Sequence, residues 1–82
     1  MSAPSPSGRP VKRSVLIAGH RTSVSLEAPF WDGLKVLADA RGLTVAQLIA
    51  EIDAARVETG LSGALRVAVL EFYRGMADGD RV

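Results

Sequence analysis

The sequence predicts a small, mainly α-helical domain with one β-strand, in which two chains pair through that strand. Three observations support this fold class. The chain has 82 residues and no cysteine; one segment alternates between apolar and polar residues, as a half-buried strand does; and the rest of the chain carries helical periodicity. A single core of this size is marginally stable, and disulfides and thiolate metal sites are excluded, so we expect stabilisation by a second chain.

The charges are unevenly distributed along the chain. Arg9, Lys12, Arg13 and Arg21 are the charged residues before residue 27, which gives this part a charge of +4. From residue 27 onward, six basic residues are outweighed by nine acidic ones, which gives −3 and a total of +1. A basic end on an acidic body favours contact between the first third of the chain and a polyanion.

The chain is expected to have three parts. Residues 1–12 hold three prolines, several serines and a glycine, a composition that predicts a disordered basic arm. Residues 13–75 form the folded domain, and residues 76–82 form a frayed tail. The apolar stretch at 15–18 is too short for a signal peptide or a membrane span, so a cytoplasmic location without membrane contact is expected.

The strand is predicted over residues 14–26. Its second half places Thr22, Val24 and Leu26 on one face and Arg21, Ser23 and Ser25 on the other. The apolar residues of the first half have the opposite parity. We interpret Gly19 as a bulge or kink that lets both halves of one strand bury their apolar side.

Three helices are predicted after the strand. Pro29 suits the first turn of a helix that ends at Gly42, and Phe30 and Trp31 belong to its buried apolar stripe. Thr44-Val45-Ala46-Gln47 reads as a capping box that begins a second helix, which ends at Gly60. Ser62 can cap a third helix, on which Arg66 and Arg74 are expected on the exposed face. A strand over residues 67–73 is the competing interpretation of this last segment.

The dimer follows from the apparent lack of a second strand. A lone strand leaves a row of unpaired backbone groups, and two copies of the strand, paired antiparallel about a two-fold axis, would satisfy them. Such a ribbon fits the major groove of double-stranded DNA. Arg21, Ser23 and Ser25 are then the expected base-contacting residues. Thr44 and Val45, at a helix start, together with Lys12, Arg13 and His20, are the expected phosphate-contacting residues.

These segments resemble a known family. The residues His-Arg-Thr-Ser-Val-Ser-Leu (20–26), the helix that starts Pro29-Phe30-Trp31, and Arg-Gly-Leu-Thr-Val-Ala-Gln-Leu (41–48) are similar to ribbon-helix-helix repressors of the Arc/MetJ/CopG type. An extra helix around residues 61–66 resembles a subgroup of that family. The resemblance implies an intertwined homodimer that regulates transcription as a repressor and binds DNA through its ribbon.

The sequence favours DNA binding over catalysis. No spacing brings His20 to a nucleophile and an orienting acid, and no phosphate-binding glycine loop is present, so no enzyme and no metal or other cofactor is expected. The alternative is a protein-interaction module or antitoxin-like protein that binds a partner through its C-terminal helix. The sequence does not specify the operator, the regulated genes or an effector.

Overall fold

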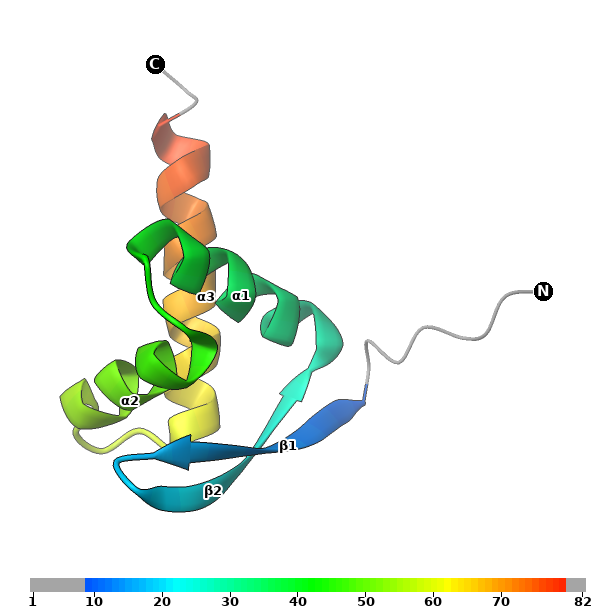
Figure 1. The fold of residues 1–82 in the computed structure, drawn as a ribbon. Helices are drawn as coiled ribbons and strands as arrows, with labels where there is room; N and C mark the ends of the chain where they lie inside the picture. Colours follow the sequence, from blue (N-terminus) through cyan, green and yellow to red (C-terminus); the bar gives the residue numbers. More distant parts are fainter. Residues whose placement is uncertain (1–8, 80–82) are drawn as a thin grey trace.

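The computed structural model describes residues 9–79 of the chain, which form a two-stranded sheet followed by three helices (Figure 1). The elements, in chain order, are β1 (Pro10–Ile17), β2 (His20–Glu27), α1 (Ala28–Arg41), α2 (Val45–Ala55) and α3 (Leu61–Gly79). β1 lies against α2, and β2 lies against α1 and α3. The hairpin therefore lies at one end of the helices, and the carboxyl end of α3 projects away from it (Figure 1).

The single strand predicted over residues 14–26 is wrong: the chain contains two strands that pair with each other. β1 and β2 are antiparallel, with Pro10 opposite Glu27 and Ile17 opposite His20. The two residues between them, Ala18 and Gly19, both have positive φ, at 51° and 82°. Positive φ at both central positions is typical of the type I′ turn, which matches the twist of a hairpin.

The turn explains the parity change that was attributed to a bulge. The two-residue loop places odd-numbered residues of β1 opposite even-numbered residues of β2, so the two halves bury apolar residues of opposite parity on the same face. Because β1 supplies the hydrogen-bonding partner of β2, a second chain is not needed to pair the backbone groups of the strand. The intertwined dimer is consequently a proposal about assembly, taken up below, and no longer a requirement of strand pairing.

The apolar face of the hairpin covers the helices. This inner face carries Val11, Val15 and Ile17 from β1 and Val24 and Leu26 from β2. Val24 and Leu26 are fully buried, as the alternation predicted. They join one core with residues from all three helices: Trp31, Leu34, Leu37, Ala38, Leu48, Ile49, Leu65 and Val69.

Trp31 attaches the hairpin to α1. Its indole is buried, and its Nε1 donates a hydrogen bond of 2.9 Å to the carbonyl oxygen of Val11 in β1. The prediction that Trp31 belongs to the core is confirmed. Because this carbonyl is held by a side chain of α1, the position of the ribbon relative to the helices is specified by a directional contact as well as by apolar packing.

The helix boundaries match the predicted signals except at the end of the second helix and the start of the third. α1 has Pro29 in its first turn and ends at Gly42, whose N–H donates to Ala38 and Asp39. α2 begins at the predicted capping box, but it ends at Ala55 and not at Gly60. Arg56 is the C-cap residue, and its side chain donates to Asp53 and to the carbonyl of Thr59, which orders the connection to α3. α3 begins at Leu61, so Ser62 lies in its first turn and is not the cap; Gly60 precedes the helix, and its carbonyl accepts from the N–H of Ala64.

The segment 67–73 is helical, so the strand alternative is wrong for this part of α3. The helix continues to Gly79 and therefore includes residues 76–79 of the predicted frayed tail. At the other end, residues 10–12 of the predicted arm belong to β1. Residues 1–8 of the arm and 80–82 of the tail lie outside the described residues. In the described part of the chain, no helix is both long and apolar enough to span a membrane.

α3 crosses α1 at Gly33. A Cβ atom built on Gly33 would lie 2.5 Å from Cγ1 of Val69 and 3.4 Å from Cε2 of Tyr73. The first distance is shorter than any ordinary carbon–carbon contact, so a larger residue at this position would require the Val69 side chain or one of the two helices to shift. Glycine in a helix interior costs about 1 kcal/mol relative to alanine. That cost at Gly33 is offset by the close packing of the two helices.

Candidate nucleic-acid interface

The hairpin turns a polar face away from the helices, which we call the outer face. It consists of Lys12, Ser14 and Leu16 from β1 and Arg21, Ser23 and Ser25 from β2. These residues are exposed except for Ser25, which is partly buried. The predicted base-contacting residues therefore share one face, because Arg21, Ser23 and Ser25 alternate with the buried residues of the same strand.

The residues of the outer face form three cross-strand pairs. Lys12 lies opposite Ser25, Ser14 opposite Ser23, and Leu16 opposite Arg21. In a hairpin closed by a two-residue turn, the pair next to the turn is hydrogen-bonded and the following pair is not, so these three are non-hydrogen-bonded pairs. Their Cα atoms are expected to lie about 4.5 Å apart, with neighbouring side chains. Three pairs thus form one continuous surface.

Two residues of this face, Ser14 and Leu16, were not predicted from the sequence. Ser14 and Leu16 were placed on an upstream extension of the strand, whereas the hairpin puts them beside Ser23 and Arg21. The signal was present in the chain: two alternating segments of opposite parity, separated by a dipeptide ending in glycine, are typical of a tight hairpin. Lys12 was predicted as a phosphate contact from the arm, but the structure gives it a fixed place at one end of the face.

The outer face carries positive charge at both ends. Lys12 and Arg21 supply it, and neither is in an ion pair within the described part of the chain. The nearest acidic residue of β2, Glu27, lies beyond Ser25 and is bound by Arg66 of α3. Arg66 donates through Nε to one carboxylate oxygen at 2.9 Å and through Nη2 to the other at 3.3 Å. A polyanion that approached the hairpin would therefore meet two cations and one neutralised acid.

The ion pair with Arg66 also changes the acidity of Glu27. The hydrogen bond from Arg66 is the main cause that lowers the pKa of this carboxyl, and the backbone N–H of Glu27 adds to it. Glu27 is the N-cap residue of α1, where a negative charge is favourable. Arg66, which was expected on the exposed face of its helix, instead connects α3 to the junction of β2 and α1.

Two predicted phosphate-contacting residues lie on the inner face of the hairpin. Arg13 lies opposite Val24, and its guanidinium lies over the Trp31 ring, 5.0 Å from the ring centroid. His20 lies opposite Ile17, next to the turn, and is exposed. The structure therefore separates Arg13 and His20 from Lys12 and Arg21. Phosphate contact by either of them stays a prediction.

Thr44 and Val45 begin α2, as predicted. The Thr44 hydroxyl accepts from the N–H of Gln47 at 3.0 Å, and the Gln47 side chain accepts from the N–H of Thr44 at 2.9 Å. The capping box thus satisfies two N–H groups, which leaves those of Val45 and Ala46 for an external acceptor. The hydroxyl proton of Thr44 is a further donor beside them. These groups lie in the helical part of the molecule, separate from the outer face.

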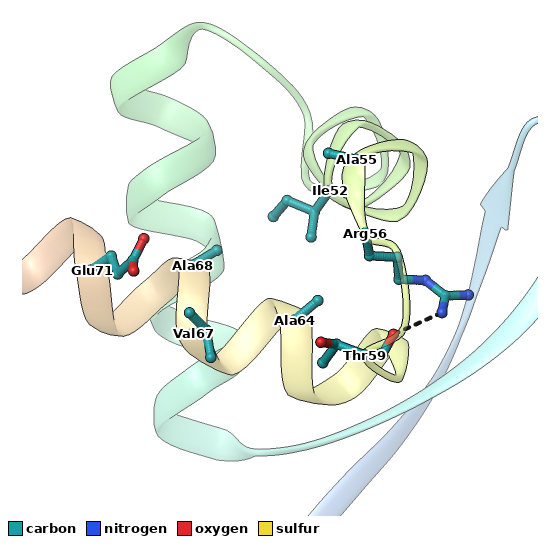
Figure 2. A pocket seen from close by; sticks show the side chains of 8 residues that line it. All are labelled: Ile52, Ala55, Arg56, Thr59, Ala64, Val67, Ala68 and Glu71. Atoms are coloured by element: carbon teal, nitrogen blue, oxygen red, sulfur yellow. Dashed lines mark hydrogen bonds between the residues drawn. The ribbon is translucent and has the colours of Figure 1, made fainter.

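A groove lies on a different surface, between the end of α2 and α3 (Figure 2). Its volume is about 420 Å³. The lining is mostly small or aliphatic and comprises Ile52, Ala55, Arg56, Thr59, Ala64, Val67, Ala68 and Glu71. The hydrogen bond from Arg56 to Thr59 closes one side of it (Figure 2). Among residues 9–77, whose side chains the structure describes, no group of three histidine, aspartate or glutamate side chains lies close enough together to hold a metal ion.

Comparison with known proteins agrees with this geometry. A family model described as a ribbon-helix-helix domain matches residues 10–73, which include both strands and most of the three helices. The chain belongs to the ribbon-helix-helix family. Its members are generally DNA-binding or regulatory proteins, and the resemblance found in the sequence is thereby confirmed.

One solved structure extends the comparison. This ribbon-helix-helix chain is similar to an uncharacterized protein from Bordetella pertussis Tohama I, with a TM-score of 0.76 and 31% sequence identity. The match covers 94% of this chain and 66% of that protein, so the chain spans about two thirds of its relative's length. No protein among the curated sequences matches the chain.

Proposed function

We propose that this chain is a sequence-specific DNA-binding regulator of transcription, a repressor, that inserts its two-stranded β-ribbon into the major groove of double-stranded DNA. The observation that carries the proposal is the outer face: a two-stranded ribbon with Lys12 and Arg21 at its ends and hydroxyl groups between them. The major groove admits a two-stranded ribbon. Membership of the ribbon-helix-helix family supports the same function.

The residues of the outer face have separate roles in this proposal. Arg21 donates two hydrogen bonds to guanine, because its planar guanidinium matches the O6 and N7 acceptors of that base. Ser23 and Ser25 donate to or accept from neighbouring base edges. Lys12 neutralises a phosphate at the edge of the groove, and the N–H groups at the start of α2, with Thr44 and Val45, hold a second phosphate.

We also propose that the regulator acts as a homodimer in which two chains exchange β1. The register supports this arrangement, because β1 of one chain paired with β2 of the other would keep every cross-strand pair of the closed hairpin. Ala18 supports it as well, since a non-glycine residue at φ 51° is unfavourable by about 1–2 kcal/mol and would relax in an extended strand. The exchanged dimer carries two copies of the outer face.

The test of DNA binding is the substitution Arg21→Ala. The variant is expected to keep the fold and to bind its preferred DNA more weakly by about 1–3 kcal/mol, the contribution of one bidentate base contact. The preferred DNA is first selected by the wild-type protein from a randomised duplex pool, and affinities are then measured at two salt concentrations.

Arg74→Ala is the matched control, because Arg74 is exposed on α3. It is expected to retain the sequence preference of the wild-type protein. Equal and negligible binding by the wild type and both variants would reject the DNA-binding function. The remaining alternative is then a protein-interaction module, and the groove between α2 and α3 is the concave surface that the described residues offer for it.

A further inference from the structure

Leu16 is an apolar residue that faces solvent on a polar surface. It lies in β1 on the outer face, and 59% of its surface is exposed, whereas its neighbour Ile17 is buried on the inner face. The other residues of the outer face are lysine, arginine and serine. Leu16 therefore has no role in the hydrophobic core.

The hairpin places Leu16 beside Arg21. The two residues lie directly opposite each other in a non-hydrogen-bonded pair, in which side chains are closest. The next pair toward the middle of the hairpin, Ser14 and Ser23, has small side chains. Leu16 and Arg21 consequently project beyond their neighbours. The same pair forms whether β1 and β2 come from one chain or from two that have exchanged strands.

We propose that Leu16 contacts the 5-methyl group of a thymine that lies within one base-pair step of the guanine contacted by Arg21. This inference rests on the proposed function, because it requires the outer face to lie in the major groove. The thymine methyl is the apolar group on the base edges of that groove. A leucine directly opposite a base-contacting arginine on the same face is placed to cover it.

The chemistry gives the pair a combined specificity. Arg21 selects a guanine through two hydrogen bonds, and Leu16 selects a thymine through removal of apolar surface from water. Successive base pairs are separated by about 3.4 Å, and the Cβ atoms of a directly opposed cross-strand pair by about 4.5–5.5 Å. The two side chains thus reach the same or adjacent base pairs, so their preferences appear together in the bound sequence.

The experiment uses the duplex selected by the wild-type protein. Each thymine is replaced in turn by deoxyuridine, which lacks only the methyl group, and the affinity of each duplex is measured. Comparison of the sequence preferences of wild type and Arg21→Ala identifies the guanine that Arg21 contacts. One replacement next to this guanine is expected to weaken wild-type binding about four-fold, the effect of one buried methyl-sized group.

Two variants complete the test. Leu16→Ser should bind the thymine and deoxyuridine duplexes equally well. Leu70→Ser makes the same change at a leucine of α3 with similar exposure, 53%, and should retain the wild-type preference for thymine. The wild-type measurement needs no substitution, so it remains decisive even if Leu16→Ser is poorly folded.

The outcomes separate the inference from the proposed function. Wild-type binding that is unaffected by every thymine replacement overturns the role of Leu16 and leaves DNA binding by Arg21 intact. Absence of binding to any duplex overturns the proposed function and this inference together.

Discussion

Glu27 and Arg66 illustrate how a single residue pair connects three elements. Glu27 ends β2 and caps α1, and Arg66 reaches it from α3 with two hydrogen bonds. The Arg66 guanidinium also lies over the Phe30 ring, 5.9 Å from its centroid. The ion pair neutralises an acidic residue near the outer face. It also attaches α3 to the junction of β2 and α1.

The lowered pKa of Glu27 predicts a pH-dependent contribution to stability. A carboxyl with a lower pKa in the folded chain than in the unfolded chain stabilises the fold above its unfolded pKa, which is about 4.5. This stabilisation is lost as the pH falls through the folded-state pKa. As the pH is lowered into the acid range, the free energy of unfolding of the wild-type protein should therefore decrease more steeply than that of Arg66→Gln.

Urea unfolding of both proteins at a series of pH values between neutral and strongly acidic checks this expectation. Arg74→Gln, which changes an exposed arginine of the same helix, should follow the wild-type profile. Parallel pH profiles for wild type and Arg66→Gln would show that the ion pair does not contribute. The sequence did not predict the pair, because the two residues are 39 positions apart and no local periodicity relates them.

The close packing of α1 against α3 depends on a glycine, which has no side chain, at position 33. Gly33 was not recognised in the sequence because a glycine inside a helical pattern usually signals only a weak helix. Its role appears when α3 is in place, with Val69 where a Cβ atom would be. The periodicity of each helix could be predicted, whereas the contact between their faces depends on three-dimensional packing.

Gly33→Ala should destabilise the protein. Alanine favours the helix by about 1 kcal/mol, but the overlap with the buried Val69 should cost more, since overpacked cores lose about 1–3 kcal/mol. Chemical denaturation measures the net change. Gly75→Ala is the matched control, because a Cβ atom there meets nothing within 4 Å, and it should stabilise the chain by about 0.5–1 kcal/mol.

A second substitution tests whether Val69 causes the destabilisation. In a Val69→Ala background the obstructing Cγ1 is absent, so adding Gly33→Ala should be neutral or stabilising. If Gly33→Ala destabilises both backgrounds equally, the contact between α1 and α3 is not the cause.

The hairpin shows how far elements could be predicted from the chain. The starts of the first two helices, the capping box at Thr44 and the buried face of β2 followed from local patterns, and the structure contains them. The strand count did not follow, because Ala-Gly is a weaker turn signal than Asn-Gly or Asp-Gly. Ser14 and Leu16 were missed for the same reason: they lie beside Ser23 and Arg21 only once the chain turns at Ala18.

At the scale of the whole molecule, the closed hairpin and the proposed exchanged dimer differ in whether β1 pairs with β2 of the same chain or of a second chain. The chain has no cysteine, so any disulfide that forms in a variant with two introduced cysteines joins those two positions, within one chain or between two chains. Ser14 and Ser23 are directly opposite each other. In the double variant Ser14→Cys/Ser23→Cys, oxidation at micromolar concentration should link two chains, because each strand pairs with its partner's strand.

Denaturing electrophoresis without reductant distinguishes the two states. Covalent dimers support the exchange, whereas oxidised monomers alone reject it while leaving the outer face unchanged. Adding Ala18→Asn provides the control, since asparagine tolerates positive φ better than alanine and favours the closed type I′ turn. It should raise the fraction of intrachain disulfide, and a monomeric sedimentation profile should accompany that change.

Trp31 gives this molecule an intrinsic optical reporter. It is the single tryptophan of the chain, its indole is buried, and its Nε1 bonds to β1 on the side of the hairpin away from the outer face. Its fluorescence should therefore remain almost constant when a ligand occupies the outer face, and shift toward longer wavelength when β1 leaves the helices. Emission during a titration thus distinguishes binding by an intact ribbon from binding that requires the ribbon to detach.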